Sequence, residues 1–144
     1  MTAYEVRAYM SKAWKIDKEL KAKYNALEEM RSMAEKATVS FSGMPGMPQG
    51  NSSRVEHYAI KLVEAQQDME ECVGNLLDIR SRIQKMIELA EDPLQRAALT
   101  EYHLNGRTAE QTADCVGYSL SQVWRLMNGA YERIAEKLTR NDME

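Results

Sequence analysis

Residues 108–127 read TAEQTADC-VGYS-LSQVWRLM, and this stretch decides the fold that we expect. Thr108 and Ser119 each precede a run of helix-forming residues, where a hydroxyl accepts a hydrogen bond from a backbone N–H of the first turn. Gly117 lies between the runs, at a tight turn that a residue with a Cβ atom would resist. Ala113 is small, so a second helix can cross the first closely. The stretch therefore predicts two short helices joined by a turn, the order of parts in a helix-turn-helix.

The flanking sequence predicts further helices. Residues 93–104 carry apolar side chains at helical spacing, with Asp92 as a suitable N-cap and Pro93 at a first-turn position. The second helix of the pair continues downstream along one apolar side, formed by Val123, Leu126, Ala130, Ile134 and Leu138.

Two long stretches, residues 6–37 and 55–90, repeat apolar residues in alternating steps of three and four, as coiled coils do. Each series forms a seam along its helix; Leu27 and Cys72 belong to these seams, and Lys23 is their one polar residue. Residues 39–53 lie between the two stretches and hold two of the three prolines and three of the seven glycines, so we predict a loop there. The fold we expect is all-α: a long antiparallel, coiled-coil-like hairpin over residues 1–91, then a helix-turn-helix domain over residues 92–140.

Apolar residues also lie outside the two predicted seams, and they widen the apolar stripe of each helix. They are Trp14, Tyr24, Ile60, Val63, Val73, Leu77 and Ile87. A hairpin alone would leave much of this stripe uncovered, so we expect a homodimer formed through its outer face.

Composition indicates an ordinary globular protein, with 44% hydrophobic and 28% charged residues. No apolar run approaches the roughly 20 residues that span a bilayer, and the first residues do not resemble a signal peptide. Cys72 and Cys115 show no paired spacing, which favours free thiols in a reducing compartment. We expect a cytoplasmic protein that does not associate with membranes.

The net charge of -3 is unusual for a protein that binds nucleic acid strongly. Residues 119–140 are an exception, because they hold four Lys/Arg and two Asp/Glu. We expect weak non-specific affinity for DNA, with useful binding that depends on a dimer or on RNA polymerase.

The last third of the chain resembles region 4 of sigma-70 factors. The resemblance rests on Arg96 and Leu99 with Tyr102 in the first helix, the glycine loop at Gly106, the residues from Thr108 to Gly117, and the helix from Ser119 to Leu138. The whole arrangement also resembles small phage-encoded regulators of the ArpU and RinA type. The resemblance implies a phage or prophage transcriptional regulator that binds promoter or operator DNA.

Carried over by position, the resemblance implies DNA contacts at Arg96, Arg107, Thr108, Ser119, Leu120, Ser121, Gln122, Trp124 and Arg125. Gln122 would pair with adenine and Arg125 with guanine or a phosphate. Arg96, Arg107 and Thr108 would anchor phosphates. Positions 120, 122 and 124 are commonly basic in primary sigma factors and are neutral here, which leaves the target sequence open. For Trp124 we weigh stacking on the DNA backbone against packing on the long helices, and favour exposure.

The same sequence bears on other functions. His57 and His103 stand alone without metal-ligand spacing, and no phosphate-binding loop or nucleophile motif is present, so we expect no enzyme, cofactor or metal. One alternative is a helical module that binds sigma factor or RNA polymerase without affinity for DNA, which the acidic net charge favours. Another is a small terminase-like packaging protein, although such proteins usually carry the DNA-binding module first.

Overall fold

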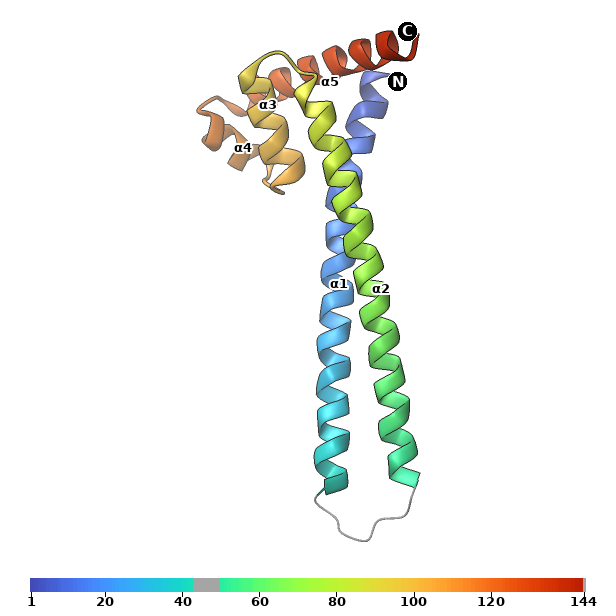
Figure 1. Cartoon of the computed structure of the whole chain (residues 1–144). Helices are drawn as coiled ribbons and strands as arrows, with labels where there is room; N and C mark the ends of the chain where they lie inside the picture. Colours follow the sequence, from blue (N-terminus) through green and yellow to red (C-terminus); the bar gives the residue numbers. More distant parts are fainter. Residues whose placement is uncertain (43–49, 144) are drawn as a thin grey trace. The chain divides into compact units, whose positions relative to one another are not determined.

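A computed structural model describes residues 1–42 and 50–143, and these residues contain helices and no strand (Figure 1). The elements are α1 (Ala3–Ser42), α2 (Gly50–Glu88), α3 (Pro93–Leu99), the π-helix η1 (Thr100–Leu104), α4 (Ala109–Val116) and α5 (Leu120–Met143). The predicted all-α class is confirmed.

The predicted loop over residues 39–53 is too long. Helix α1 continues to Ser42 and α2 begins at Gly50, while residues 43–49 lie outside the described residues. Both prolines of the stretch, Pro45 and Pro48, fall within that inner segment. Because proline is what most strongly breaks a helix, the outer residues are compatible with helix on both sides.

The chain forms two compact units, which we describe separately. The helix-pair unit consists of residues 17–75, and the composite unit consists of residues 1–16 with residues 76–144. Both borders fall inside the long helices. The predicted division into residues 1–91 and 92–140 is a different one and stays a prediction.

In the helix-pair unit the α1 and α2 segments lie side by side (Figure 1). Leu27 and Cys72 of the predicted seams are buried, at 2% and 6% exposure. The polar Lys23 is accommodated on the α1 seam because its ammonium forms a 2.8 Å ion pair with Asp68 of α2. This hydrogen bond raises the pKa of Lys23.

Apolar side chains outside the seams of this unit face solvent. Tyr24 and Met33 of α1 and Ile60 and Val63 of α2 each keep between 51% and 59% of their surface exposed. The unit therefore has large apolar side chains that its own two helices leave uncovered.

The composite unit is built around α5. Helices α3 and α4 pack against α5 and against each other. The buried side chains of this part are Ala98, Leu99, Thr112, Ala113, Val123, Met127, Ala130, Tyr131, Ile134 and Ala135. The start of α1, the last part of α2 and the turn after it add more buried side chains: Val6, Met10, Ala13, Leu76, Ile83, Met86, Ile87 and Ala90.

On the predicted apolar side of α5, Val123, Ala130 and Ile134 are buried, whereas Leu126 and Leu138 are only half-buried. Leu126 is half-buried, and Met127 is buried completely. Steps of four, three and four residues from Val123 reach Met127 before Ala130 and Ile134, which is the period of an α-helix. Leu126 lies beside this stripe rather than on it.

The predicted helix over residues 93–104 exists but changes type halfway. Asp92 caps α3 by accepting a hydrogen bond from Leu94 N, and Pro93 occupies the first turn, as expected. From Thr100 the chain widens into the π-helix, closed by a bond from Asn105 N to the Thr100 carbonyl. Arg80 of α2 donates to the Leu104 carbonyl at 2.6 Å, so α2 supports the end of this turn.

Arg133 and Lys137 of α5 form ion pairs within the chain. Their side chains lie 2.7 Å and 3.1 Å from the Glu91 carboxylate, which follows α2. Hydrogen bonds from Arg133 and Lys137 lower the pKa of Glu91 to about 2. These pairs fix the middle of α5 against the end of α2.

Candidate nucleic-acid interface

The turn between α4 and α5 has the local geometry that the sequence predicts. Thr108 accepts a hydrogen bond from Gln111 N, and the Gln111 side chain accepts one from Thr108 N, which completes a capping box. Gly117 ends α4 in the left-handed region at φ 76° and ψ 29°. The amides of Gly117 and Tyr118 both donate to the Ala113 carbonyl, so the turn satisfies the end of the helix.

Helix α5 begins with a second box of the same kind. Ser119 Oγ accepts from Gln122 N at 3.3 Å, and Gln122 Oε1 accepts from Ser119 N at 3.0 Å. Ser119 is therefore the cap that was predicted. The amide oxygen of Gln122 serves the helix terminus in this structure, so bidentate pairing with adenine would require the side chain to leave the cap, and its DNA contact stays a prediction.

The outward side of the first turns of α5 is accessible. Ser119, Leu120, Ser121, Gln122 and Arg125 are all exposed. A recess of about 320 Å³ adjoins this surface, lined by Gln95, Tyr118, Gln122, Arg125 and Leu126. We call the five exposed residues the α5 surface.

Trp124 does not have the exposure that we favoured. Its indole is half-buried and lies edge-on to the ring of Tyr102, with centroids 5.7 Å apart. The guanidinium carbon of Arg7, on α1, lies 5.2 Å from the centroid of the indole. Packing against a long helix, the second possibility raised by the sequence, describes Trp124 better than a free ring does.

Arg96 is also used within the chain. Its Nη1 donates to the carbonyls of Ala90 and Glu91 at 2.8 Å and 2.9 Å, so it joins α3 to the end of α2. The structure gives it this structural task, and we leave it out of the proposed contacts. Arg107 is exposed and pairs with Glu101 at 3.6 Å.

His103 of η1 and Tyr131 of α5 form a buried polar pair. His103 Nε2 and Tyr131 Oη share a hydrogen bond of 2.6 Å, and their exposed fractions are 4% and 2%. Burial, helped by the positive charge of Arg7, lowers the pKa of His103 to about 4. Burial raises the pKa of the Tyr131 phenol above its ordinary value. Both side chains are therefore neutral near pH 7.

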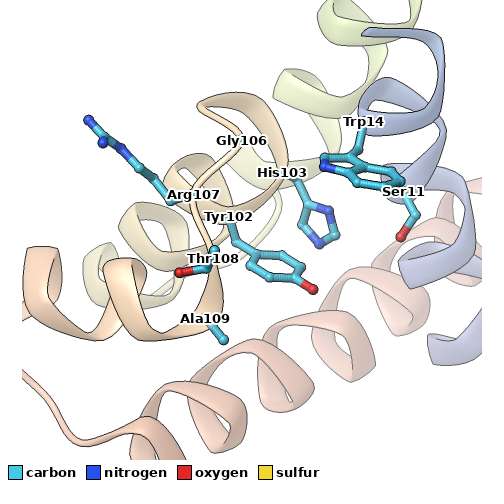
Figure 2. A pocket seen from close by; sticks show the side chains of 8 residues that line it. All are labelled: Ser11, Trp14, Tyr102, His103, Gly106, Arg107, Thr108 and Ala109. Carbon is cyan, nitrogen blue, oxygen red and sulfur yellow. The ribbon is translucent and has the colours of Figure 1, made fainter. Parts of the chain in front are cut away.

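A cavity of about 400 Å³ lies between the start of α1 and the loop that precedes α4, and Figure 2 shows the side chains that line it. Trp14, Tyr102 and His103 supply aromatic walls, and Gly106, Arg107 and Thr108 belong to the loop. The side chain of Arg107 points away from the aromatic rings (Figure 2). The two predicted phosphate contacts Arg107 and Thr108 thus lie at the edge of this cavity.

Sequence reasoning missed Arg7 as a neighbour of α5. Its position in α1 has no motif around it, and Trp124 lies almost at the other end of the chain. The aromatic pair of Tyr102 and Trp124 was missed in the same way, because both residues were assigned to separate helices.

Comparison with known protein families, with curated proteins and with solved structures finds no match to this chain. Within the described part, no three His, Cys, Asp or Glu side chains are grouped so that they could hold a metal ion. None of the helices, searched over the same residues, is long and apolar enough to cross a membrane. Cys72 and Cys115 are free cysteines, as expected.

Proposed function

We propose that the chain is a cytoplasmic transcriptional regulator of phage or prophage type that binds promoter or operator DNA through a sigma region 4-like helix-turn-helix formed by α4 and α5. The observation that carries the proposal is the α5 surface. A capped helix follows a left-handed glycine turn, and its first two turns present Ser121 and Arg125 to solvent. A helix of this kind fits the major groove of B-DNA with its N-terminal residues at the base edges.

Each group of this surface has a role suited to its chemistry. The Arg125 guanidinium is exposed and can donate two parallel hydrogen bonds to guanine or a phosphate. Ser121 donates or accepts a hydrogen bond at a base edge, and Leu120 contacts a thymine methyl group. Thr108 and Arg107 lie before α4, where phosphates would be anchored.

The proposal includes a homodimer. Two-fold binding of half-sites is the common way in which a small helix-turn-helix reaches useful affinity, and the net charge of -3 makes additional contacts necessary. The uncovered side chains of Tyr24, Met33, Ile60 and Val63 in the helix-pair unit supply an apolar surface for a second copy.

The test is an unbiased selection of bound duplexes from a random pool, followed by titration of the enriched duplex at fixed salt. R125A is expected to lose about 1–3 kcal/mol of specific binding free energy, which is roughly a tenfold to hundredfold rise in Kd. The matched control is R140A, because Arg140 is an exposed arginine near the other end of the same helix. R140A should keep the sequence preference. A pool without enrichment, or equal losses in both variants, would refute DNA reading by α5.

One observation favours a second candidate, a helical module that binds sigma factor or RNA polymerase. Tyr118, which lines the recess next to α5, exposes 39% of its surface. Leu120 exposes 40%, and Leu94 of α3 exposes 37%. Exposed apolar side chains near a recess suit a protein partner. Copurification of polymerase that is lost in L120S, together with no enrichment of DNA, would select this candidate.

A further inference from the structure

Arg7 of α1 is held beside α5 without being buried. Its guanidinium carbon lies 5.2 Å from the centre of the Trp124 indole, within the range of a cation–π contact. The ring of Tyr102 also contacts the indole, edge-on at an angle of 71°, and helps to hold it in place. Arg7 itself remains exposed. The contact therefore orients the guanidinium while water still reaches it.

No carboxylate of the residues that the structure describes forms an ion pair with Arg7. Among the ion pairs of the described residues, Arg31, Arg107 and Arg133 each have an acidic partner, and Arg7 has none. Its positive charge is instead felt by the buried His103 and lowers the pKa of that imidazole. An oriented and unpaired guanidinium is the group that best binds a phosphate oxygen.

The position of Arg7 relative to α5 matters for a bound duplex. Trp124 lies in the second turn of α5, directly before Arg125 of the α5 surface. A helix in the major groove has a sugar–phosphate strand along each side, so a cation beside its first turns meets phosphates rather than bases. Arg7 stands on the Trp124 side of the helix, whereas the recess with Gln95 and Tyr118 lies beside Gln122 and Arg125.

From these contacts we propose that Arg7 binds a phosphate of duplex DNA next to α5, positioned by the indole of Trp124. This inference rests on the proposed function. The N-terminal helix thereby adds a cation to a DNA-binding surface that is poor in positive charge. Arg7 carries no sequence information, and it strengthens binding to all duplexes alike.

The experiment measures the salt dependence of binding of the full chain to the selected duplex and to a random-sequence duplex. The logarithm of the association constant falls with the logarithm of the salt concentration by about 0.9 for each phosphate neutralised. R7A is expected to reduce this slope by about 0.9 on both duplexes, and R7K, which keeps the charge, is expected to restore most of it. Circular dichroism of each variant monitors the fold.

Lys12 supplies a matched control. It is another exposed cation of α1, and its ammonium lies 5.0 Å from the ring centre of Tyr9. K12A should leave the slope unchanged. Equal reductions in R7A and K12A would indicate only a general effect of net charge, and an R7A slope equal to that of the wild type would also overturn the inference. The proposed function would survive both results if R125A still weakens specific binding. Absence of duplex binding by the wild-type chain would refute both.

Discussion

The burial of His103 beside Tyr131 should make the protein less stable as the pH falls into the mildly acidic range. The pKa of His103 is about 4 in the folded protein, compared with an ordinary value of 6.5. As the pH falls below 6.5, the unfolded chain takes up the proton first, so the folded state loses stability down to about pH 4. The stability associated with the neutral His103 is therefore fully present above pH 6.5 and fully lost below pH 4.

The magnitude can be worked out from the two pKa values. The difference between the folded and unfolded pKa values corresponds to a loss of about 3 kcal/mol in the free energy of unfolding once His103 is protonated in both states. Between about pH 7.5 and about pH 5 the expected loss from His103 alone is about 2 kcal/mol. Urea denaturation followed by circular dichroism at the two pH values measures this loss directly, and it avoids the range in which most carboxyl groups titrate.

Two variants separate His103 from everything else that titrates. H103Q removes the buried imidazole and is expected to be less stable at neutral pH, with a much smaller change on acidification. H57Q removes the chain's other histidine, which is exposed on α2, and should retain the wild-type change. If H103Q loses as much stability as the wild type between the two pH values, the argument from burial is wrong.

Three further predictions concern local contacts. G117A places a Cβ at φ 76° and should destabilise the fold by about 1 kcal/mol in urea denaturation. The control G74A, in open space on α2, should stabilise the fold by up to about 1 kcal/mol. A stabilising effect of G117A would contradict the turn geometry. T108A should cost about 1 kcal/mol in the same assay through loss of the capping box, and T108S should retain most of it; equal losses in the two variants would show that the hydroxyl is not the cause. R133A should raise the pKa of Glu91 from about 2 toward 4.5 in a carboxyl NMR titration, and an unchanged value would mean that the pair does not form in solution.

The local parts of the site could be predicted from the sequence because they depend on neighbouring residues. A hydroxyl at Thr108 or Ser119 can cap only the helix that comes directly after it, and Gly117 fits a left-handed turn wherever the rest of the chain lies. The seam residues Leu27 and Cys72 follow from helical periodicity in the same way.

The contacts that Arg96 and Trp124 make within the chain could not be read from the sequence in the same way. The carbonyls of Ala90 and Glu91 lie close before Arg96 in the sequence, but no pattern marks their contact with its guanidinium. Arg7 lies near the opposite end of the chain from Trp124, and nothing near either residue indicates their contact. The capping contact of Gln122 could have been predicted locally, because a serine followed three residues later by glutamine is itself a capping pattern. Recognising that pattern would have assigned the amide oxygen to the helix terminus.

The π-helix at residues 100–104 determines on which side of the helix axis the following residues lie. A bond from Asn105 N to the Thr100 carbonyl encloses one residue more than an α-helical turn does. Deleting Glu101 would let α3 continue with ordinary α-helical bonds, but each later residue would turn by roughly 100° about the axis, one residue's share of a 3.6-residue turn. Leu104 would then move its carbonyl away from Arg80, and the loop to α4 would start from a different side of the helix. The extra residue of the π-helix therefore determines the direction in which the chain leaves the helix toward α4.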